Sequence, residues 1–439
     1  MGKEAARWWH ALWLVWMVVA RLTWLGTLGG GESEAYGVSA NGSVVVGVAE
    51  NAAGQDRAFR WTAARGMRDL GTLGGDSSLA LGVSADGSVV VGWAQNALWD
   101  WRAFRWTASG GMQNLGTLGG NNSGANAVSA DGAVVVGWAQ DAASQPRAFR
   151  WTAASGMQGL GTLLGSTQSE ARGVSADGAV VVGGVYCRAF RWQNGVMQDL
   201  GTLPSGNGSW AWFVSADGGV VVGVAYNAAW QWRAFRWTAS GGMQDLGALG
   251  GCCSTAYAVS ADGTVVVGRA SIAGGQSRAF RWTASGGMQD LGTLPGGNNS
   301  YAYGVSADGA VVVGESGWRA FRWTASGGME DLNTTYASLL TNRSVLREAR
   351  AISPNGRYIV GWGYNAATNR IEAFLLDTGS RCTAHNGDVD ANGCVDDADL
   401  LAVLFAFGGQ GYRNEDLNWD GTVDDADLLE VLFNFGSGC

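Results

Sequence analysis

The chain has 439 residues, of which 71 are glycine and only 4 are proline. This composition excludes collagen, and a hydrophobic content of 47% with 15% charged residues excludes intrinsic disorder. The net charge of −9 leaves no basic excess for binding nucleic-acid phosphates. The chain has only two histidines, His10 and His385. This small number disfavours histidine-based catalysis and histidine-ligated zinc sites.

The first twenty residues have the pattern of a secretory signal peptide. Lys3 and Arg7 precede an apolar run over residues 11–20, which ends in Val18-Val19-Ala20. An uncleaved membrane anchor is the alternative, but the run is shorter than the roughly 20 residues that a membrane span needs. We therefore predict a signal peptide over residues 1–20, a secreted or cell-surface protein, and no transmembrane segment in the mature chain.

Export permits disulfide bonds among the six cysteines. Six cysteines allow 15 pairings, and the sequence does not choose among them. A bridge between Cys382 and Cys439 is one hypothesis, since it would join the two ends of the C-terminal region described below. The cysteines are Cys187, Cys252, Cys253, Cys382, Cys394 and Cys439.

A repeated string dominates the chain after the leader. The string V-S-A-D-G-x-V-V-V-G, or a close variant, recurs every 40 to 47 residues. Seven copies are followed by R-A-F-R-W and then by a variant of D-L-G-T-L-G-G. The copies start at Val38, Val83, Val128, Val174, Val214, Val259, Val305 and, in a diverged form, Ile352.

Each repeat holds four short apolar segments separated by Asp-Gly and Gly-Gly turns, which predicts strands joined by hairpins. In the second unit the predicted strands are residues 81–84, 89–93, 102–106 and 112–118. Four strands in about 45 residues are typical of one blade of a β-propeller. The last unit lacks its fourth strand, and residues 22–28 precede the first unit. We therefore predict an all-β propeller of about eight four-stranded blades over residues 21–380, closed by the N-terminal strand.

Residues 333–350 interrupt the pattern between the last two units, where a short helix or an insertion is predicted. This segment leaves the blade number open between seven and eight.

In a four-stranded blade, the first and third turns lie on one face, and the second turn and the crossover lie on the other. The recurring turns S-A-D-G and T-A-S-G-G-M are the first and third turns, so the variable segments gather on the opposite face. Loops on a rigid scaffold carry function, and aromatic side chains suit stacking on sugar rings. The predicted ligand-binding residues on this face are Trp99, Trp101, Trp210, Trp212, Trp230, Trp232, Trp318, Tyr301 and Tyr303, together with Tyr226 and Tyr257.

The alternative interpretation is that the W-x-W pairs are ordinary strand packing, with one side chain in and one out. The tryptophan that ends each R-A-F-R-W is predicted to be structural. Paired arginines in this motif are more simply explained by salt bridges to the recurring Asp69, Asp199, Asp245, Asp290 and Asp331 than by an anion site. The aspartates of the S-A-D-G turns are explained by turn chemistry.

The repeat resembles the HAF family of extracellular repeats, which shares L-G-T-L-G-G and A-F-x-W with residues 22–377. Arg stands in place of that family's His in seven units, and Glu372 does so in the eighth. The resemblance implies export and a repeat scaffold, without an established reaction.

After Arg381 the composition changes to two acidic loops with EF-hand spacing. Gly393 and Gly421 occupy position 6 of the two loops, and position 7 would contribute a backbone carbonyl. Oxygen ligands without imidazole favour calcium over zinc, so we predict two calcium ions. The predicted ligands are Asp388, Asp390, Asn392, Cys394, Asp396 and Asp399 in the first loop, and Asp416, Asn418, Asp420, Thr422, Asp424 and Asp427 in the second.

Each loop is followed by one apolar helix, predicted over residues 400–407 and 428–435. This loop-helix pair resembles the type I dockerin modules, which bind cohesin domains in polysaccharide-degrading assemblies. The resemblance implies a small helical calcium module over residues 381–439 and a cohesin-like or cell-surface partner. Leu404-Phe405 and Leu432-Phe433 stand where that family usually carries basic and polar recognition residues.

Three functions fit these features. The first is a non-enzymatic binding scaffold, whose propeller presents an aromatic face to a carbohydrate or protein and whose tail docks through calcium. The second is an extracellular glycoside hydrolase or lyase; the carboxylates available on the variable face are Glu32, Glu34, Asp100, Asp141, Glu170 and Glu315. The third is a structural protein of an envelope layer. No residue is predicted to be catalytic under the first function.

Overall fold

The computed structural model describes residues 20–163, 165–341, 343–379, 389, 395, 397–409, 415–417 and 422–434. The predicted signal peptide therefore lies outside the described residues, apart from Ala20. The predicted all-β character of the long N-terminal region is confirmed, because 32 strands occur between Arg21 and Asp377.

The strands fall into eight sets of four, which we number as blades 1 to 8 in chain order. Blade 1 is β2 (Gly29–Val38), β3 (Val45–Asn51), β4 (Asp56–Thr62) and β5 (Gly66–Asp69); blade 2 is β6 (Gly74–Val83), β7 (Val89–Asn96), β8 (Trp101–Thr107) and β9 (Gly111–Asn114); blade 3 is β10 (Gly119–Val128), β11 (Val134–Asp141), β12 (Pro146–Thr152) and β13 (Gly156–Gly159); blade 4 is β14 (Glu170–Val174), β15 (Val180–Val185), β16 (Arg188–Gln193) and β17 (Val196–Asp199). Blade 5 is β18 (Ser209–Val214), β19 (Val220–Tyr226), β20 (Trp232–Thr238) and β21 (Gly242–Asp245); blade 6 is β22 (Gly250–Val259), β23 (Val265–Ile272), β24 (Ser277–Thr283) and β25 (Gly287–Asp290); blade 7 is β26 (Ser300–Val305), β27 (Val311–Ser316), β28 (Ala320–Thr324) and β29 (Gly328–Asp331); blade 8 is β30 (Val345–Ile352), β31 (Tyr358–Asn365), β32 (Arg370–Asp377) and β1 (Arg21–Gly26).

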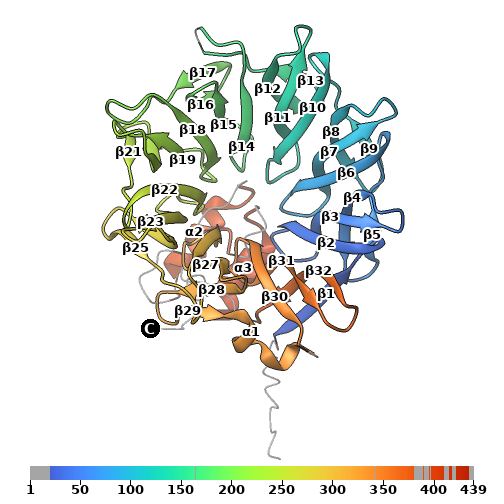
Figure 1. The fold of residues 1–439 in the computed structure, drawn as a ribbon, viewed down its shortest axis with the longest axis vertical. Helices are drawn as coiled ribbons and strands as arrows, with labels where there is room; N and C mark the ends of the chain where they lie inside the picture. Colours follow the sequence, from blue (N-terminus) through green and yellow to red (C-terminus); the bar gives the residue numbers. More distant parts are fainter. Residues whose placement is uncertain are drawn as a thin grey trace, which may run out of the picture.

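Blades 2 to 7 are separate four-stranded antiparallel sheets, and blades 1 and 8 share one sheet through a single parallel pair, Glu32 with Ile371. The sheets are arranged like spokes around a common centre, which is the β-propeller arrangement (Figure 1). The N-terminal strand β1 pairs antiparallel with β32, from Arg21 opposite Asp377 to Gly26 opposite Ala373.

The predicted boundaries in the second unit are wrong at two points. Strand β6 begins at Gly74, seven residues before the prediction, because its first part continues from the crossover. Strand β9 ends at Asn114, since Gly116 turns the chain with a φ of 85°. The residues after it belong to the crossover to the next blade.

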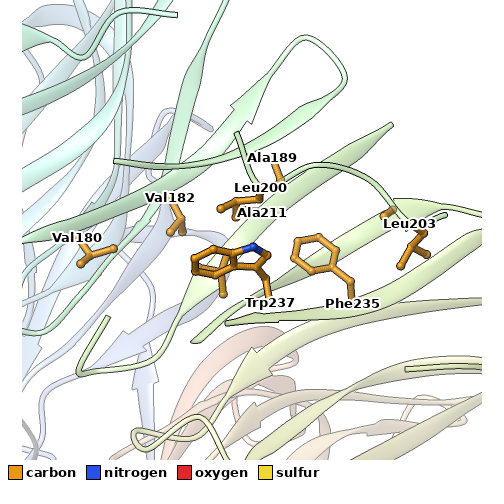
Figure 2. Close-up of a cluster of buried hydrophobic side chains, with 10 residues drawn as sticks. Val180, Val182, Ala189, Leu200, Leu203, Ala211, Phe235 and Trp237 are labelled. Carbon is orange, nitrogen blue, oxygen red and sulfur yellow. The ribbon is translucent and has the colours of Figure 1, made fainter. Parts of the chain in front are cut away.

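The hydrophobic cores lie between consecutive blades. Figure 2 shows one of them, in which Val180 and Val182 of blade 4 face Phe235 and Trp237 of blade 5. The phenylalanine of each R-A-F-R-W motif is fully buried. The tryptophan that ends the motif is buried in six copies and half-buried at Trp192, so its predicted structural role is confirmed.

The S-A-D-G turns have the predicted turn chemistry. In blade 2 the Ser84 hydroxyl donates to Asp86 at 2.6 Å, and Asp86 accepts from the Ser88 N–H at 2.9 Å. Burial raises the pKa of Asp86, but these hydrogen bonds outweigh burial and hold the pKa below its ordinary value. The alanine of each turn also donates its N–H to the next blade, starting with Ala40 to Ala85 and ending with Ala307 to Pro354.

A buried serine links each of blades 1 to 7 to the blade before it. Between blades 1 and 2, the Ser78 hydroxyl accepts from the Ala58 N–H at 2.9 Å and donates to the Gly71 carbonyl at 2.6 Å. Ser33 makes the same link between blade 8 and blade 1, accepting from the Ala373 N–H at 2.8 Å. Backbone groups that cannot reach a strand partner at these junctions are therefore satisfied by a side chain.

The prediction of salt bridges for the arginine pairs is only partly right. Asp199, Asp245 and Asp331 each form an ion pair with the first arginine of their unit, at 3.7, 3.9 and 2.6 Å. Asp69 and Asp290 instead accept a backbone N–H of their own turn. The second arginine of the motif instead donates to the glycine carbonyl in the S-A-D-G turn of the following blade.

This second arginine acts between blades. The Arg60 guanidinium donates to the Gly87 carbonyl and lies 5.6 Å from the ring centre of Trp106, both in blade 2. The same carbonyl contact recurs in Arg105, Arg150, Arg191, Arg236 and Arg281. Charge-assisted hydrogen bonds and cation–π contacts therefore join neighbouring blades.

The predicted irregular segment between the last two blades contains a short helix. Helix α1 (Leu332–Thr335) is followed by the 3₁₀ turn η1 (Ala337–Leu339) before β30 begins. The Asp331 side chain accepts the N–H of Asn333 and caps α1.

Two further helices lie in the C-terminal region, α2 (Asp397–Ala406) and α3 (Asp425–Asn434). Each starts three residues before the prediction, inside the end of its acidic loop. Within the described residues, no helix is both long enough and apolar enough to cross a membrane.

Candidate functional site

The antiparallel strand order places the second turn of every blade and the crossovers at one end of the blade. We call this end the variable face, as in the sequence prediction. The second turns run from β3 to β4 in blade 1 and correspondingly in the other blades.

Large aromatic side chains occupy the tips of the second turns in four blades. Trp99 in blade 2, Trp230 in blade 5 and Trp318 in blade 7 expose 61%, 70% and 68% of their surface, and Tyr186 in blade 4 exposes 78%. These are among the most exposed large hydrophobic side chains of the propeller. Trp99, Trp230 and Trp318 were predicted on this face, whereas Tyr186 was missed because blade 4 has a shorter turn.

The same four residues have a left-handed backbone conformation, with φ of 65°, 59°, 64° and 53° in the order above. Glycine adopts this conformation readily, but a bulky residue there is unusual and costs about 1 kcal/mol or more. Equivalent tips in blades 1 and 6 do carry glycine, Gly54 and Gly275. Backbone strain of this kind gathers at functional sites.

The remaining predicted tryptophans are neither core residues nor fully exposed. Trp101, Trp210 and Trp212 are half-buried, and Trp232 is 36% exposed. The Trp232 ring lies 4.0 Å from Tyr226 and 5.2 Å from Trp210 between ring centres. The picture of one side chain in and one out therefore fails for Trp210–Trp212, which are both half-buried, and for Trp230–Trp232, which are both exposed.

Residues two apart in a strand lie on the same face, which explains why Trp210 and Trp212 are both half-buried. Every first strand also holds a β-bulge. In blade 5, Ala211 pairs with Gly223 and Phe213 pairs with Val222, so Trp212 is left as the extra residue. Bulges are common next to sites because they re-aim a side chain. The extra residues in blades 1 to 8 are Tyr36, Leu81, Asn126, Arg172, Trp212, Tyr257, Tyr303 and Arg350.

Five of these bulge residues form a continuous row through blades 5, 6, 7, 8 and 1. Trp212 stacks on Tyr257 with ring centres 6.2 Å apart and planes 8° apart, and Tyr257 lies 5.8 Å from Tyr303. The Arg350 guanidinium then lies 5.7 Å from the ring of Tyr303 and 5.5 Å from that of Tyr36. We call these five residues the bulge row.

Five of the six carboxylates considered for catalysis have a protein partner. Asp100, Asp141 and Glu170 pair with Arg102, Arg147 and Arg172 at 3.3, 2.7 and 3.1 Å, respectively. Glu34 accepts the Tyr36 hydroxyl at 3.0 Å, and Glu315 accepts the Trp318 N–H at 2.9 Å. Glu32 takes part in the single backbone pair between blades 1 and 8.

A carboxylate that sequence analysis missed, Glu348, lies beside the bulge row. It is buried, and its Oε1 lies 2.9 Å from Arg350. Burial raises the pKa of Glu348 above its ordinary value, and the charges of Glu315 and Glu34 raise it further, while Arg350 opposes both. Glu348 occupies the position in blade 8 that Glu34 occupies in blade 1. The last repeat has diverged in sequence, so this equivalence was not recognised.

Three cavities on the variable face are lined by predicted aromatic residues. One of 260 Å³ is bordered by Trp210 and Trp212, one of 440 Å³ by Trp212 and Trp232, and one of 530 Å³ by Trp318. A separate cavity of 270 Å³ at the centre is lined by valines and alanines from the ends of the first strands. The predicted aromatic residues thus border concave sites, which is where small molecules bind proteins.

Two cysteines on this face form a disulfide between neighbours in the chain, Cys252–Cys253. It was one of the pairings that the sequence left open. Cys187 is the free cysteine of the described part of the chain. The proposed Cys382–Cys439 bridge lies outside the described residues.

Of the twelve predicted calcium ligands, five lie within the described residues, namely Asp399, Asp416, Thr422, Asp424 and Asp427. Asp399, Asp416 and Asp427 are fully buried. The Asp399 carboxylate accepts the Val389 N–H at 2.6 Å, and Asp427 accepts the Asp424 N–H at 2.8 Å. No group of three or more metal-binding side chains is assembled by the described residues alone.

The C-terminal module has a core with an internal duplication. Val395 and Val423 occupy position 8 of their loops, and Val403 and Val431 follow at matching places in α2 and α3; all four are buried. Gly408 and Gly409 exchange backbone hydrogen bonds with Val423. Three exposed apolar residues on each helix also match at a spacing of 28, namely Leu401, Leu404 and Phe405 on α2 and Leu429, Leu432 and Phe433 on α3.

Comparison with protein-family models finds no match, and a search of curated proteins finds none. Among solved structures, the chain is similar to TolB from Acinetobacter baumannii, with 11% identity and a TM-score of 0.37, over 77% of this chain and 81% of that one. It is also similar to a prolyl endopeptidase, with 13% identity and a TM-score of 0.48, over 72% and 50% of the two chains. The β-propeller domain of Cps50 (Swd1) from Myceliophthora thermophila has 12% identity and a TM-score of 0.41, over 80% and 99%.

Proposed function

We propose that the protein is a secreted or cell-surface binding scaffold, without catalytic activity, whose propeller binds carbohydrate on its variable face. The observation that carries this proposal is the set of exposed aromatic tips at Trp99, Tyr186, Trp230 and Trp318 in left-handed backbone. A fold gains nothing in stability from a large apolar side chain that is both strained and exposed. Flat rings beside concave sites suit the C–H faces of sugars.

The scaffold in this proposal is a closed ring of eight blades. The pairing of β1 with β32 and the Ser33 link from blade 8 to blade 1 support closure, because both repeat the contacts found between or within other blades. A closed ring leaves few exposed strand edges. The chain of alanine hydrogen bonds stops only at Pro354, which has no N–H to donate.

The second part of the proposal is a C-terminal module that binds two calcium ions through the two acidic loops. Three fully buried carboxylates, Asp399, Asp416 and Asp427, support it, since buried carboxylates are stabilised by a cation or by hydrogen bonds. Residues 383–439 hold 12 acidic residues and one basic residue, Arg413. Calcium would supply the positive charge that this segment lacks.

The module would dock on a cohesin-like or cell-surface protein. The matching apolar residues of α2 and α3 support a contact surface, because Phe405 and Phe433 expose 86% and 81% of their surface. The predicted leader over residues 1–20 would deliver the protein outside the cell, where calcium is abundant and disulfides persist.

Replacing Trp230 by glycine tests the binding face. We expect Trp230→Gly to raise the melting temperature slightly, because glycine accepts the left-handed φ without strain, and to weaken glycan binding at least tenfold. A glycan array followed by isothermal titration calorimetry measures binding, and differential scanning calorimetry measures stability.

Ser144→Gly is the matched control, since Ser144 occupies the equivalent tip of blade 3 with a φ of 59°. It should give the same small stabilisation and leave binding unchanged. If no glycan binds the wild-type protein, or if both variants bind as it does, the aromatic tips do not form a carbohydrate site.

One observation favours a second candidate function, an enzyme acting on polysaccharide. Glu348, Glu315 and Glu34 interact electrostatically beside Arg350 and Tyr303, and the pKa of Glu348 is raised by burial, as a general acid requires. Polysaccharide turnover that disappears in Glu348→Gln, with the folded state retained by calorimetry, would support the enzyme. We expect no turnover by the wild-type protein under the binding proposal.

A further inference from the structure

The cavity of 440 Å³ on the variable face lies between blades 5 and 6 and has an unusual wall. Trp212 and Trp232 border it from blade 5, and the Cys252–Cys253 disulfide borders it from the start of β22. The equivalent positions of blade 2 carry Asp76 and Ser77. Blade 6 therefore has a disulfide where blade 2 has a polar strand start.

The disulfide wall is held in position by one side chain. The Ser271 hydroxyl accepts the Cys253 N–H at 2.8 Å and donates to the Cys253 carbonyl at 3.0 Å. A bond between adjacent cysteines also removes the rotational freedom of both side chains. A rigid wall lowers the entropy that binding would otherwise cost.

The opposite, aromatic wall is also fixed before any ligand arrives. Trp212 is stacked on Tyr257 with planes 8° apart, and the Trp232 ring lies 4.0 Å from that of Tyr226. Both tryptophans keep part of their surface accessible. They are therefore preorganised platforms for a flat or weakly polar ligand face.

One formal charge lines the cavity, the Arg269 guanidinium, and no carboxylate does. Arg269 occupies a strand position that carries valine in blades 1 and 5 and tryptophan in blades 2 and 3. It is exposed, and among the described residues no carboxylate forms an ion pair with it; its neighbour is the Tyr257 hydroxyl. A guanidinium in this setting is suited to a planar carboxylate, which it binds through two parallel hydrogen bonds.

The geometry points to a binding site for an acidic saccharide, in which the carboxylate of a uronic acid residue lies on Arg269 and its ring packs against Trp212 or Trp232. Thr255, Ser271 and Ser277 add hydroxyl groups to the same cavity for the sugar hydroxyls. The Cys252–Cys253 bond forms the facing wall. This inference rests on the proposed carbohydrate-binding function and names the class of ligand.

The test uses the full-length protein and tetrasaccharides of glucuronate, mannuronate and galacturonate, each compared with its carboxyl-reduced form by isothermal titration calorimetry. We expect at least one uronate tetrasaccharide to bind about tenfold or more tightly than its reduced form, because a hydrogen bond to a charged group is stronger than one to a neutral group. Arg269→Gln should remove this difference, and Arg269→Lys should keep part of it. Arg65→Gln, an identical charge change in a recurring turn on the opposite face, should bind as wild type.

The wall is tested by the double variant Cys252→Ser/Cys253→Ser, which should bind the same tetrasaccharide several-fold more weakly with an unchanged melting temperature. Equal affinity for the uronate and its reduced form, or an Arg269→Gln variant that keeps the preference, overturns the acidic-saccharide site. If neutral glycans bind and lose affinity in Trp230→Gly, the carbohydrate-binding proposal stands although this inference has failed. If no glycan of either kind binds, both fail.

Discussion

Removal of calcium is expected to unfold the C-terminal module and leave the propeller folded. Each site held at a calcium concentration 100-fold above its dissociation constant would contribute about 2.7 kcal/mol. Two such sites exceed the small stability that a hydrophobic core of this size supplies. Adding a chelator should therefore make residues 389–434 sensitive to protease, while the melting transition of the propeller stays in place.

Two variants, Asp427→Asn and Asp425→Asn, test whether position 12 of the second loop is a calcium ligand. Asp427 is fully buried at position 12 of the second loop, whereas Asp425, two residues earlier, is exposed in the same helical turn. Both are acidic residues in the first turn of α3, so the same change to asparagine affects the helix dipole similarly. Calorimetric titration should find two calcium ions per wild-type and Asp425→Asn chain, and one per Asp427→Asn chain.

A protein that takes up no calcium, or a module whose protease resistance ignores the chelator, would contradict the metal proposal. Equal calcium stoichiometry in Asp427→Asn and Asp425→Asn would show that position 12 is not a ligand. Neither result would bear on the propeller, which holds none of the predicted ligands.

Most of the propeller was predictable because the same strand and turn pattern recurs in every repeat. The valine triplets, the Asp-Gly turns and the buried phenylalanine each satisfy one strand or hairpin requirement, and the strands follow in the predicted order. The sequence also predicted that Trp99, Trp230 and Trp318 lie on the variable face. The antiparallel hairpins determine which turns share a face. These are consequences of local chemistry and connectivity.

The features that escaped prediction depend on contacts across blades or on a single extra residue. A bulge that leaves Trp212 unpaired has no mark in the sequence, because the residues around it read as an ordinary alternating strand. The carbonyl of Gly87 became the partner of Arg60 only because the two blades pack at that distance. Glu348 was missed because the last unit no longer carries the repeated sequence motifs.

The closed ring can be tested at one residue with an internal reference. Leu25 lies in β1, between the pairs Trp24–Phe374 and Gly26–Ala373, and is buried in the core between blades 8 and 1. Leu70 holds the equivalent place between blades 1 and 2. They are 5% and 7% exposed, so the two sites bury the same side chain to the same extent. In a closed ring, Leu25→Ala and Leu70→Ala should each destabilise the propeller by about 2–5 kcal/mol.

Differential scanning calorimetry and urea unfolding measure this comparison. Equal losses, with a single transition retained in both variants, require that the junction between the last and first blades packs as tightly as an internal junction. If Leu25→Ala costs much less than Leu70→Ala, β1 frays from β32 and the ring is open in solution. The consequence would reach the binding face, because the bulge row crosses this junction from Arg350 to Tyr36 and needs the two blades side by side.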